Sequence, residues 1–253
     1  MTGRVEAAGH ELEYIDLPGG DPPFLLLHEG LGSVSMWREF PSQLAQATGS
    51  RVVAYSRAGF GLSSPQPAPY DTRFIHDEAE KVTPQLRERL GLARPVVFGH
   101  STGASMSLVH AAGPWPVAGV IAEAPLITVE ASNIEAIRKA RETFEASRDW
   151  RVRLARHHED VKAVFYGWND TWLRPDFRDW NILADLGRIQ APVLAILGED
   201  DEYSTPAQVD LVRTHLPRDT AFRSLLLPGC GHAPHRDLPG PVLGEVRKFL
   251  AAL

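Results

Sequence analysis

The sequence predicts an α/β protein with a mostly parallel, doubly wound sheet of about eight strands and a helical insertion after the sixth strand. Short apolar runs alternate with helix-like stretches from residue 24 to residue 122. Continuous apolar runs of this kind are typical of strands covered on both faces. Residues 130–186 contain no strand-like run, and the alternation resumes at residue 193. A connection from strand through helix to strand favours parallel pairing, so we expect one parallel sheet with helices on both faces.

The predicted strands begin with an outer one at residues 10–17. Its apolar side chains alternate imperfectly, and it ends at a turn rich in proline and glycine. The other strands are continuous apolar runs, as expected for the centre of a parallel sheet. They cover residues 24–27, 51–55, 96–98, 117–122, 193–197 and 224–227.

Two helices are predicted in the first half of the chain, where apolar side chains recur every three or four residues. The first covers residues 37–49. A proline-punctuated loop that runs to Pro69 precedes the second, at residues 71–90. Pro84 is expected to kink or split that second helix because proline lacks an N–H group and clashes with the preceding turn.

Two further helices are predicted near the C-terminus. We expect Thr205 and Gln208 to form a capping box at the start of one of them, with Pro206 at its first position. The final helix carries apolar side chains at helical spacing over residues 242–250.

The segment at residues 130–186 is predicted to be a helical cap inserted into a core domain formed by residues 1–129 and 187–253. It contains four of the six tryptophans in the chain: Trp150, Trp168, Trp172 and Trp180. Single tryptophans usually fill a core, whereas a group of four in an insertion is equally compatible with a helical layer whose tryptophans fill the core and with a lid that faces a substrate. Trp150, Trp168 and Trp172 are therefore candidate pocket residues.

Composition and charge limit the classes of function. The chain has 253 residues, a formal net charge of −6 and no segment rich in lysine and arginine alone, so nucleic acid is not an expected partner. Its apolar runs are far shorter than the roughly 20 residues of a membrane-spanning helix, and its first residues lack the apolar stretch of a secretory signal. Cys230 is the only cysteine and is expected to be a buried residue in a turn. We expect a cytoplasmic protein that acts on a small molecule without a metal or cofactor, as a monomer or a homodimer.

A five-residue motif, G-x-S-x-G, occupies residues 99–103, between a predicted strand and a run of small residues at 104–112. In this motif the serine lies in a sharp strand-to-helix turn that exposes its hydroxyl group, and the flanking glycines let the two backbones approach each other. Ser101 is therefore the candidate nucleophile.

A serine hydroxyl group becomes a strong nucleophile only when an imidazole accepts its proton and a carboxylate holds that imidazole. In a parallel sheet these groups are expected on loops after the carboxyl ends of strands. His232 follows the last predicted strand and is the candidate base, whereas His28 is expected to support the loop beside the nucleophile. The candidates for the carboxylate, in order of preference, are Asp201, Asp200 and Glu123.

Five segments contain this motif, its candidate partners and the loops expected beside them: LLLHEG at residues 25–30, YSRAGFGLSS at 55–64, GHSTG at 99–103, LGEDDEYS at 197–204 and PGCGHAPHRD at 228–237. In these segments and their order the chain resembles the α/β-hydrolase fold superfamily, and specifically its single-domain, cap-bearing, esterase-like members. The resemblance implies that Ser101 is the nucleophile, Asp201 the acid and His232 the base. It also implies an oxyanion hole formed by the backbone N–H groups of Thr102 and Gly30, with Leu31 as the alternative to Gly30.

Two positions depart from the pattern of that superfamily. Glu29 occupies the first glycine position of the usual H-G-x-G, and Ser56-Arg57-Ala58-Gly59 replaces the usual D-x-x-G turn. A carboxylate beside an oxyanion would oppose catalysis, so we expect Glu29 to turn away and pair with Arg57 or an arginine of the cap. Glu29 and His100 are further candidates for the substrate pocket.

These observations predict a serine hydrolase that cleaves a carboxylic ester of a small, apolar or aromatic substrate through an acyl-enzyme. A carbon–carbon bond hydrolase (acting on a meta-cleavage product) and a thioesterase would use the same three residues and stay open as alternatives. A hydrolase-fold ligand-binding module with slow turnover is an alternative of a different class.

Overall fold

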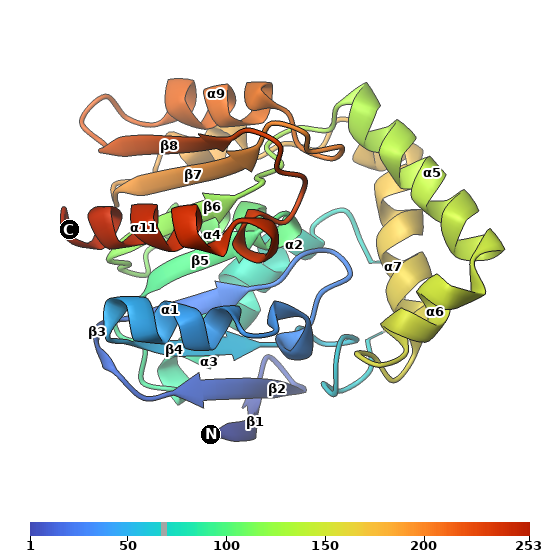
Figure 1. Ribbon diagram of the computed structural model, residues 1–253, viewed down its shortest axis with the longest axis horizontal. Helices are drawn as coiled ribbons and strands as arrows, with labels where there is room; N and C mark the ends of the chain where they lie inside the picture. The colour runs from blue at the N-terminus through green and yellow to red at the C-terminus, as the bar shows by residue number, and fades with distance from the viewer. Residues whose placement is uncertain (67–69) are drawn as a thin grey trace.

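The computed structural model describes residues 1–66 and 70–253, so the end of the proline-punctuated loop at Pro69 lies outside the described residues. Its centre is a twisted eight-stranded sheet with the strand order β1-β2-β4-β3-β5-β6-β7-β8 (Figure 1). Strands β3 to β8 pair in parallel, whereas β1 and β2 are antiparallel at one edge. The predicted fold class, a mostly parallel and doubly wound sheet, is confirmed.

The strands agree with the predicted apolar runs except at the N-terminus. Residues 2–7 form an additional edge strand that the sequence did not indicate, because its side chains are mostly exposed and only its last residue is buried. The strands are β1 (Thr2–Ala7), β2 (His10–Leu17), β3 (Gly20–Leu27), β4 (Ser50–Tyr55), β5 (Val96–His100), β6 (Gly119–Glu123), β7 (Val193–Gly198) and β8 (Phe222–Leu227).

Helices cover both faces of the sheet. The helices of the core are α1 (Phe40–Thr48), α2 (Phe74–Asp77), α3 (Thr83–Arg89), α4 (Thr102–Ala111), α9 (Pro206–His215), α10 (Pro234–Asp237) and α11 (Pro239–Leu250). The helices between β6 and β7 are α5 (Ala131–Ala146), α6 (Arg148–Leu154), α7 (Val161–Leu173) and α8 (Leu183–Leu186). Short 3₁₀ turns occur at Val34–Trp37 and Pro175–Phe177.

Alternate residues of each strand point to opposite faces, which divides the core into two layers. Phe24 and Leu26 of β3 pack under α1 and α11, whereas Leu25 and Leu27 pack under α4 and its neighbours α2 and α3. Because both faces are covered, the central strands are apolar at nearly every position. This explains why continuous apolar runs in the sequence predict the central strands correctly.

Pro84 interrupts the second predicted helix, as expected. Residues Glu78–Val82 form a wider π-helical turn between α2 and α3. Pro84 follows in the first turn of α3, where a missing N–H group costs no intrahelical hydrogen bond.

The predicted capping box at α9 is wrong, although Thr205 is the N-cap residue and Pro206 the first helical residue. The Thr205 hydroxyl group donates to the carboxylate of Glu130 instead. Gln208 turns away from the helix end, and its Oε1 accepts hydrogen bonds from the backbone N–H groups of Ile127 and Thr128, at 2.7 and 3.1 Å. Both side chains therefore attach α9 to the start of the helical insertion.

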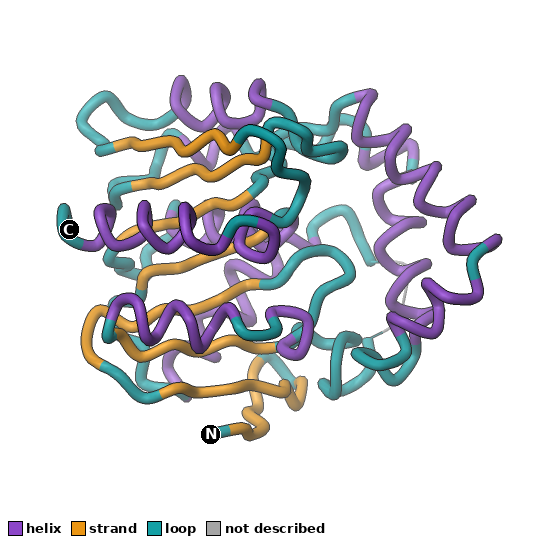
Figure 2. Tube along the Cα trace, viewed as in Figure 1, coloured by secondary structure: helices purple, strands orange, loops and turns teal. Residues whose placement is uncertain are grey.

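Helices α5, α6 and α7, within the insertion predicted at residues 130–186, lie beyond the carboxyl ends of the parallel strands (Figure 1). Figure 1 shows α5, α6 and α7 at the end of the sheet to which the arrowheads of β4 and β6 to β8 point. The loops that leave these strands, teal in Figure 2, face the same helices. Among the described residues, no helix is both long and apolar enough to cross a membrane.

The turn between β5 and α4 brings three backbones into contact. A Cβ atom added to Gly99 would lie 2.0 Å from the carbonyl oxygen of Gly103, and one added to Gly103 would lie 2.1 Å from that of Leu27 in β3. Real Cβ atoms do not approach backbone so closely, so only glycine allows α4 to pack against β3 and β5 here.

This close approach predicts that Gly103→Ala will lower the free energy of unfolding by about 3 kcal/mol, the upper end of the cost of overpacking. Gly244→Ala in α11 is the matched control, because a Cβ atom there meets nothing within 4 Å. It should stabilise the protein by about 0.5–1 kcal/mol, as alanine does in a helix. Urea unfolding of both variants makes the comparison, and equal effects of the two substitutions would contradict the packing argument.

Candidate active site

Three loops at the carboxyl ends of parallel strands bring Ser101, Asp201 and His232 together. Ser101 lies in the turn between β5 and α4, with φ 55° and ψ −119°. Few non-glycine residues adopt a positive φ, and such strain persists only where the surrounding structure enforces it. Asp201 follows β7, and His232 follows β8.

Hydrogen bonds connect these three residues in a chain. The Nε2 atom of His232 lies 2.9 Å from the hydroxyl oxygen of Ser101, and its Nδ1 atom lies 2.8 Å from both carboxylate oxygens of Asp201. The carboxylate only accepts hydrogen bonds, so Nδ1 carries the proton and Nε2 is free to accept one from Ser101. Backbone N–H groups of Tyr203 and Ser204 donate to Asp201 Oδ1 and hold it in place.

The other two acid candidates lie elsewhere. Asp200 is exposed to solvent. The carboxylate of Glu123 is buried, but it contacts His235 rather than His232. Of the three predicted carboxylates, the structure therefore brings Asp201 to His232.

The environment of His232 raises its pKa above the ordinary value. Burial alone would lower this pKa, but the hydrogen bond and the charge of Asp201 oppose burial, and the charges of Glu29 and Glu202 add to them. The imidazolium that forms when His232 accepts a proton is therefore stabilised at the position where Ser101 would release one.

Thr102 is the first residue of α4, so its N–H group lies at the positive end of a helix beside Ser101. On the opposite loop, the N–H group of Leu31 donates to the carboxylate of Glu29 at 2.9 Å. Leu31 is thus already engaged, and Gly30 is left as the better candidate for a second donor. A Cβ atom on Gly30 would lie 2.4 Å from the indole ring of Trp168, so a larger residue here would displace that ring.

The expected ion pair of Glu29 with Arg57 or a cap arginine is not what the structure shows. The carboxylate of Glu29 accepts the N–H group of Leu31 instead. Arg57 binds backbone oxygens of the same loop, donating to the carbonyl groups of His28 at 2.5 Å and Glu29 at 2.9 Å. His28 is buried and supports the loop, since its Nε2 atom accepts the N–H group of Arg57.

Glu13 of β2, which sequence analysis missed, supplies a carboxylate to the turn in which Ser56 replaces the usual aspartate. Its Oε2 atom accepts hydrogen bonds from the Ser56 hydroxyl group at 2.8 Å and from the N–H group of Leu62 at 3.0 Å. Ser56 in turn accepts the N–H group of Val34. Nothing in the local sequence of β2 signals this role, because it depends on the antiparallel pairing of β2 with β4.

The sequence profile of the alpha/beta hydrolase family matches residues 24–245 of the chain. The chain belongs to this family. It is 25% identical to a proline iminopeptidase of Lactobacillus delbrueckii subsp. lactis, over 84% of each chain. It is also 29% identical to a putative carbamate hydrolase of Pseudomonas savastanoi pv. phaseolicola, over 92% of this chain and 95% of that one. The structure of the enol-lactonase from Burkholderia xenovorans LB400 has the same fold, with a TM-score of 0.74 and 22% identity over 98% of this chain and 100% of that one.

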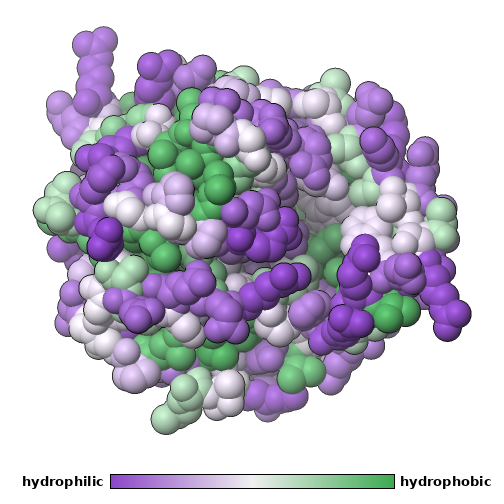
Figure 3. Space-filling model, viewed as in Figure 1, coloured by the Kyte–Doolittle hydropathy of each residue, from purple (hydrophilic) through white to green (hydrophobic). Residues whose placement is uncertain are grey.

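In this alpha/beta hydrolase, a cavity of about 280 Å³ adjoins Ser101 and His232. It lies between the core and the helical insertion, where Figure 3 shows a recess to the right of centre. All five predicted pocket residues line it: Glu29, His100, Trp150, Trp168 and Trp172. Apolar side chains missed by sequence analysis complete its wall, among them Met36, Leu126, Ile137 and Leu154.

Charged side chains also line this cavity. Glu29 and Glu202 bring negative charge, and Arg236 brings positive charge but pairs with Asp237 at 2.9 Å. Glu202 directly follows Asp201 in the sequence, so its place beside the cavity could have been predicted from that of Asp201.

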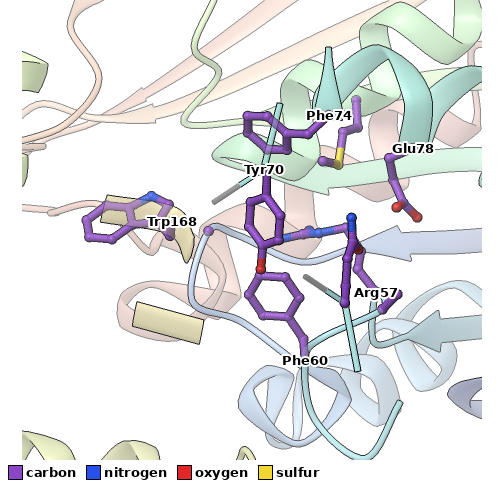
Figure 4. Close-up of a pocket in the computed structure, with 10 residues that line it drawn as sticks. Arg57, Phe60, Tyr70, Phe74, Glu78 and Trp168 are labelled. Carbon is purple, nitrogen blue, oxygen red and sulfur yellow. The ribbon is translucent and has the colours of Figure 1, made fainter. Parts of the chain in front are cut away.

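Trp168 and Gly30 line both this cavity and a smaller one of about 30 Å³. Figure 4 shows Arg57, Phe60, Tyr70, Phe74 and Glu78 around the smaller cavity. Arg57 is buried there with its guanidinium group 4.7 Å from the centre of the Phe60 ring. Trp168 therefore lies against Gly30 on one side and against the aromatic residues of the smaller cavity on the other.

Among the described residues, His100, Glu123 and His235 have donor atoms close enough to suit a metal ion, all within 4.8 Å of one another. Glu123 Oε2 lies only 2.7 Å from His235 Nδ1, and His100 Nε2 lies 2.6 Å from the carbonyl oxygen of His232. Ligands of a tetrahedral zinc ion would lie about 3.3 Å apart at ordinary metal–ligand distances. These contacts are hydrogen bonds, and the group does not fit a metal in this arrangement.

The pKa of His232 leads to a prediction about pH. A base must be neutral to accept the proton of Ser101, so a catalytic role for His232 predicts that activity falls as the pH drops through a pKa that lies above the ordinary value. Glu29→Gln and Glu202→Gln each remove a charge that raises this pKa, so the acid limb of kcat/KM should move to lower pH in both. Glu199→Gln, an exposed acid of the same loop, serves as the control and should leave the limb in place. An acid limb that stays at the same pH or moves to higher pH in Glu29→Gln and Glu202→Gln would refute this prediction.

Proposed function

We propose that this protein is a serine hydrolase that cleaves carboxylic esters of small, apolar or aromatic substrates through a covalent acyl-enzyme. The observation that carries the proposal is the chain of hydrogen bonds from Ser101 through His232 to Asp201. It lies beside the N-terminus of α4 and opens into a cavity. A hydroxyl group, a base and a carboxylate in this order are the parts that acyl transfer requires.

In the proposed reaction, the Ser101 oxygen attacks the ester carbonyl carbon while its proton passes to His232 Nε2. The N–H groups of Thr102 and Gly30 hold the negatively charged oxygen of the tetrahedral intermediate, and losing one such donor costs on the order of 3 kcal/mol. His232 then returns the proton to the leaving alcohol. Water repeats the sequence on the acyl-enzyme and releases the acid. Every proton transfer uses a group of this chain, so the scheme requires no metal or cofactor.

The walls of the cavity support a small and largely apolar substrate. Its volume of about 280 Å³ is near the lower limit of pockets that bind small molecules. Trp150, Trp168 and Ile137 from the helical insertion line it together with Leu126 of the core. In this proposal the insertion acts as a lid that excludes water from the acyl-enzyme and limits the length of the acyl chain.

A second candidate is a peptidase that removes an N-terminal residue. Glu29 and Glu202 line the cavity, and two carboxylates beside the reacting serine would favour a substrate with a free ammonium group. The relatives named proline iminopeptidase agree with this alternative. Amide hydrolysis would use the same three residues.

The proposal predicts that Ser101→Ala will abolish hydrolysis of small aryl esters, and that Asp201→Asn will lower kcat by about 10⁴-fold because the wrong tautomer of His232 is then favoured. Asp200→Asn is the matched control and should retain most of the activity. Initial rates with p-nitrophenyl acetate provide the measurement. Substantial activity of Ser101→Ala would remove the basis of the proposal.

A substrate panel distinguishes the candidates. It would contain p-nitrophenyl esters of graded chain length, an acyl thioester, a dienoic ketone and an amino-acid p-nitroanilide with a free amine. We expect the highest kcat/KM for short or aromatic esters. A preference for the anilide, abolished by Glu29→Gln, would identify the peptidase instead.

A further inference from the structure

Glu123 is a buried acidic residue that the proposed reaction does not use. It is the last residue of β6, and its side chain is fully buried. A buried carboxylate is costly unless hydrogen bonds compensate for its lost hydration. In this structure both of its oxygens are engaged by one residue of the loop that carries His232.

That residue is His235, three positions after His232. Its backbone N–H group donates to Glu123 Oε1 at 2.5 Å, and its ring Nδ1 lies 2.7 Å from Glu123 Oε2. The ring of His235 is itself buried and packs against Trp37 and Phe40, with ring centres 4.8 and 5.1 Å away. The carboxylate therefore holds the end of the histidine loop, defined here as residues 228–235, against the rigid sheet.

The backbone of Glu123 holds the other reacting group. Its carbonyl oxygen accepts the N–H group of Ser101 at 2.8 Å. Ser101 thus hydrogen-bonds to the main chain of the residue whose side chain binds His235. Ser101 and the loop that carries His232 are therefore both hydrogen-bonded to one residue at the end of β6.

His100 provides a second connection between the same two loops. Its Nε2 atom lies 2.6 Å from the carbonyl oxygen of His232, so a protonated Nε2 donates a hydrogen bond to it. The His100 ring lies between the rings of His232 and His235, at 5.0 and 4.9 Å. Burial and the two neighbouring histidines lower the pKa of His100 well below its ordinary value, which keeps this ring neutral.

We infer that Glu123 is a positioning residue that sets the distance between Ser101 and His232 by hydrogen-bonding the histidine loop to the nucleophile turn. The inference rests on the proposed function, because it concerns the geometry of that reaction. A displacement of about 1 Å between reacting groups can cost on the order of 10²-fold in rate. The histidine loop contains no strand and only the first two residues of α10, so it depends on such contacts for its position.

Two substitutions of Glu123 separate hydrogen bonding from charge. Glu123→Leu removes both acceptors at similar volume and should lower kcat on a small aryl ester by on the order of 10²-fold, with little change in KM. Glu123→Gln keeps an acceptor for the His235 N–H group, and its amide can donate to His235 Nδ1 in the other tautomer. We therefore expect a loss below about tenfold for Glu123→Gln.

The matched control is Asp185, another buried carboxylate that pairs with a histidine, His76, at 3.2 Å. It lies in α8, outside the loops that carry Ser101 and His232. Asp185→Leu and Asp185→Asn should reduce stability to urea but leave kcat within about twofold of the wild-type value, as expected for a merely structural pair.

A second readout does not depend on turnover. The low-field proton resonance of the His232–Asp201 hydrogen bond should shift or broaden in Glu123→Leu and change only slightly in Glu123→Gln. If Glu123→Leu does not fold, His235→Phe takes its place, because it removes the Nδ1 donor to Glu123 Oε2 and keeps an aromatic ring against Trp37 and Phe40. An unchanged resonance together with an unchanged kcat in that variant would overturn the inference.

The remaining outcomes are also decisive. Equal losses in Glu123→Gln and Glu123→Leu would mean that charge matters and not hydrogen bonding, which contradicts a positioning role. A folded Glu123→Leu with full kcat and lowered stability would reduce Glu123 to a structural residue. Failure of the proposed function is recognised separately, because wild-type protein would then hydrolyse no ester and the resonance of the variants would still report on the loop.

Discussion

The close approach of α4 to β3 and β5 is the constraint on which the rest of the site depends. Gly99 and Gly103 let the helix begin almost in contact with the strand backbones. In this turn Ser101 adopts a positive φ. The same geometry puts the N–H group of Thr102 beside the serine hydroxyl group at a helix N-terminus. A strained residue, a serine that lines the cavity and a partial positive charge are thus found together at one packing contact.

The loops around this turn are held by contacts between distant segments. Arg57 is buried and donates to two carbonyl groups of the loop at Gly30. Glu13 supplies from β2 the carboxylate that the turn at Ser56 lacks. Departures from the usual pattern of the family are thus compensated by side chains elsewhere in the sequence. The carboxylate of Glu29 forms a local hydrogen bond with Leu31, which keeps its charge near His232 without an arginine partner.

Much of the fold could be predicted because the central strands are buried on both faces and read as continuous apolar runs. The edge strand β1 could not, since its side chains are largely exposed and carry no such signal. The G-x-S-x-G motif and the chain order of Ser101, Asp201 and His232 predicted which residues meet, because carboxyl ends of parallel strands converge. Contacts made by Glu13, Gln208 and Glu123 depend on tertiary packing and have no local pattern. The sequence features that predict where the site lies therefore do not predict the hydrogen bonds that keep its loops in position.

The most direct test of this account is a crystal structure of the adduct formed with a small alkyl phosphonate ester, a probe that mimics the tetrahedral intermediate. We expect a covalent bond between phosphorus and the Ser101 oxygen. We also expect a phosphoryl oxygen about 2.7–3.1 Å from the backbone nitrogens of Thr102 and Gly30. A phosphorus atom bonded to another residue, or a phosphoryl oxygen that contacts neither nitrogen, would contradict this account.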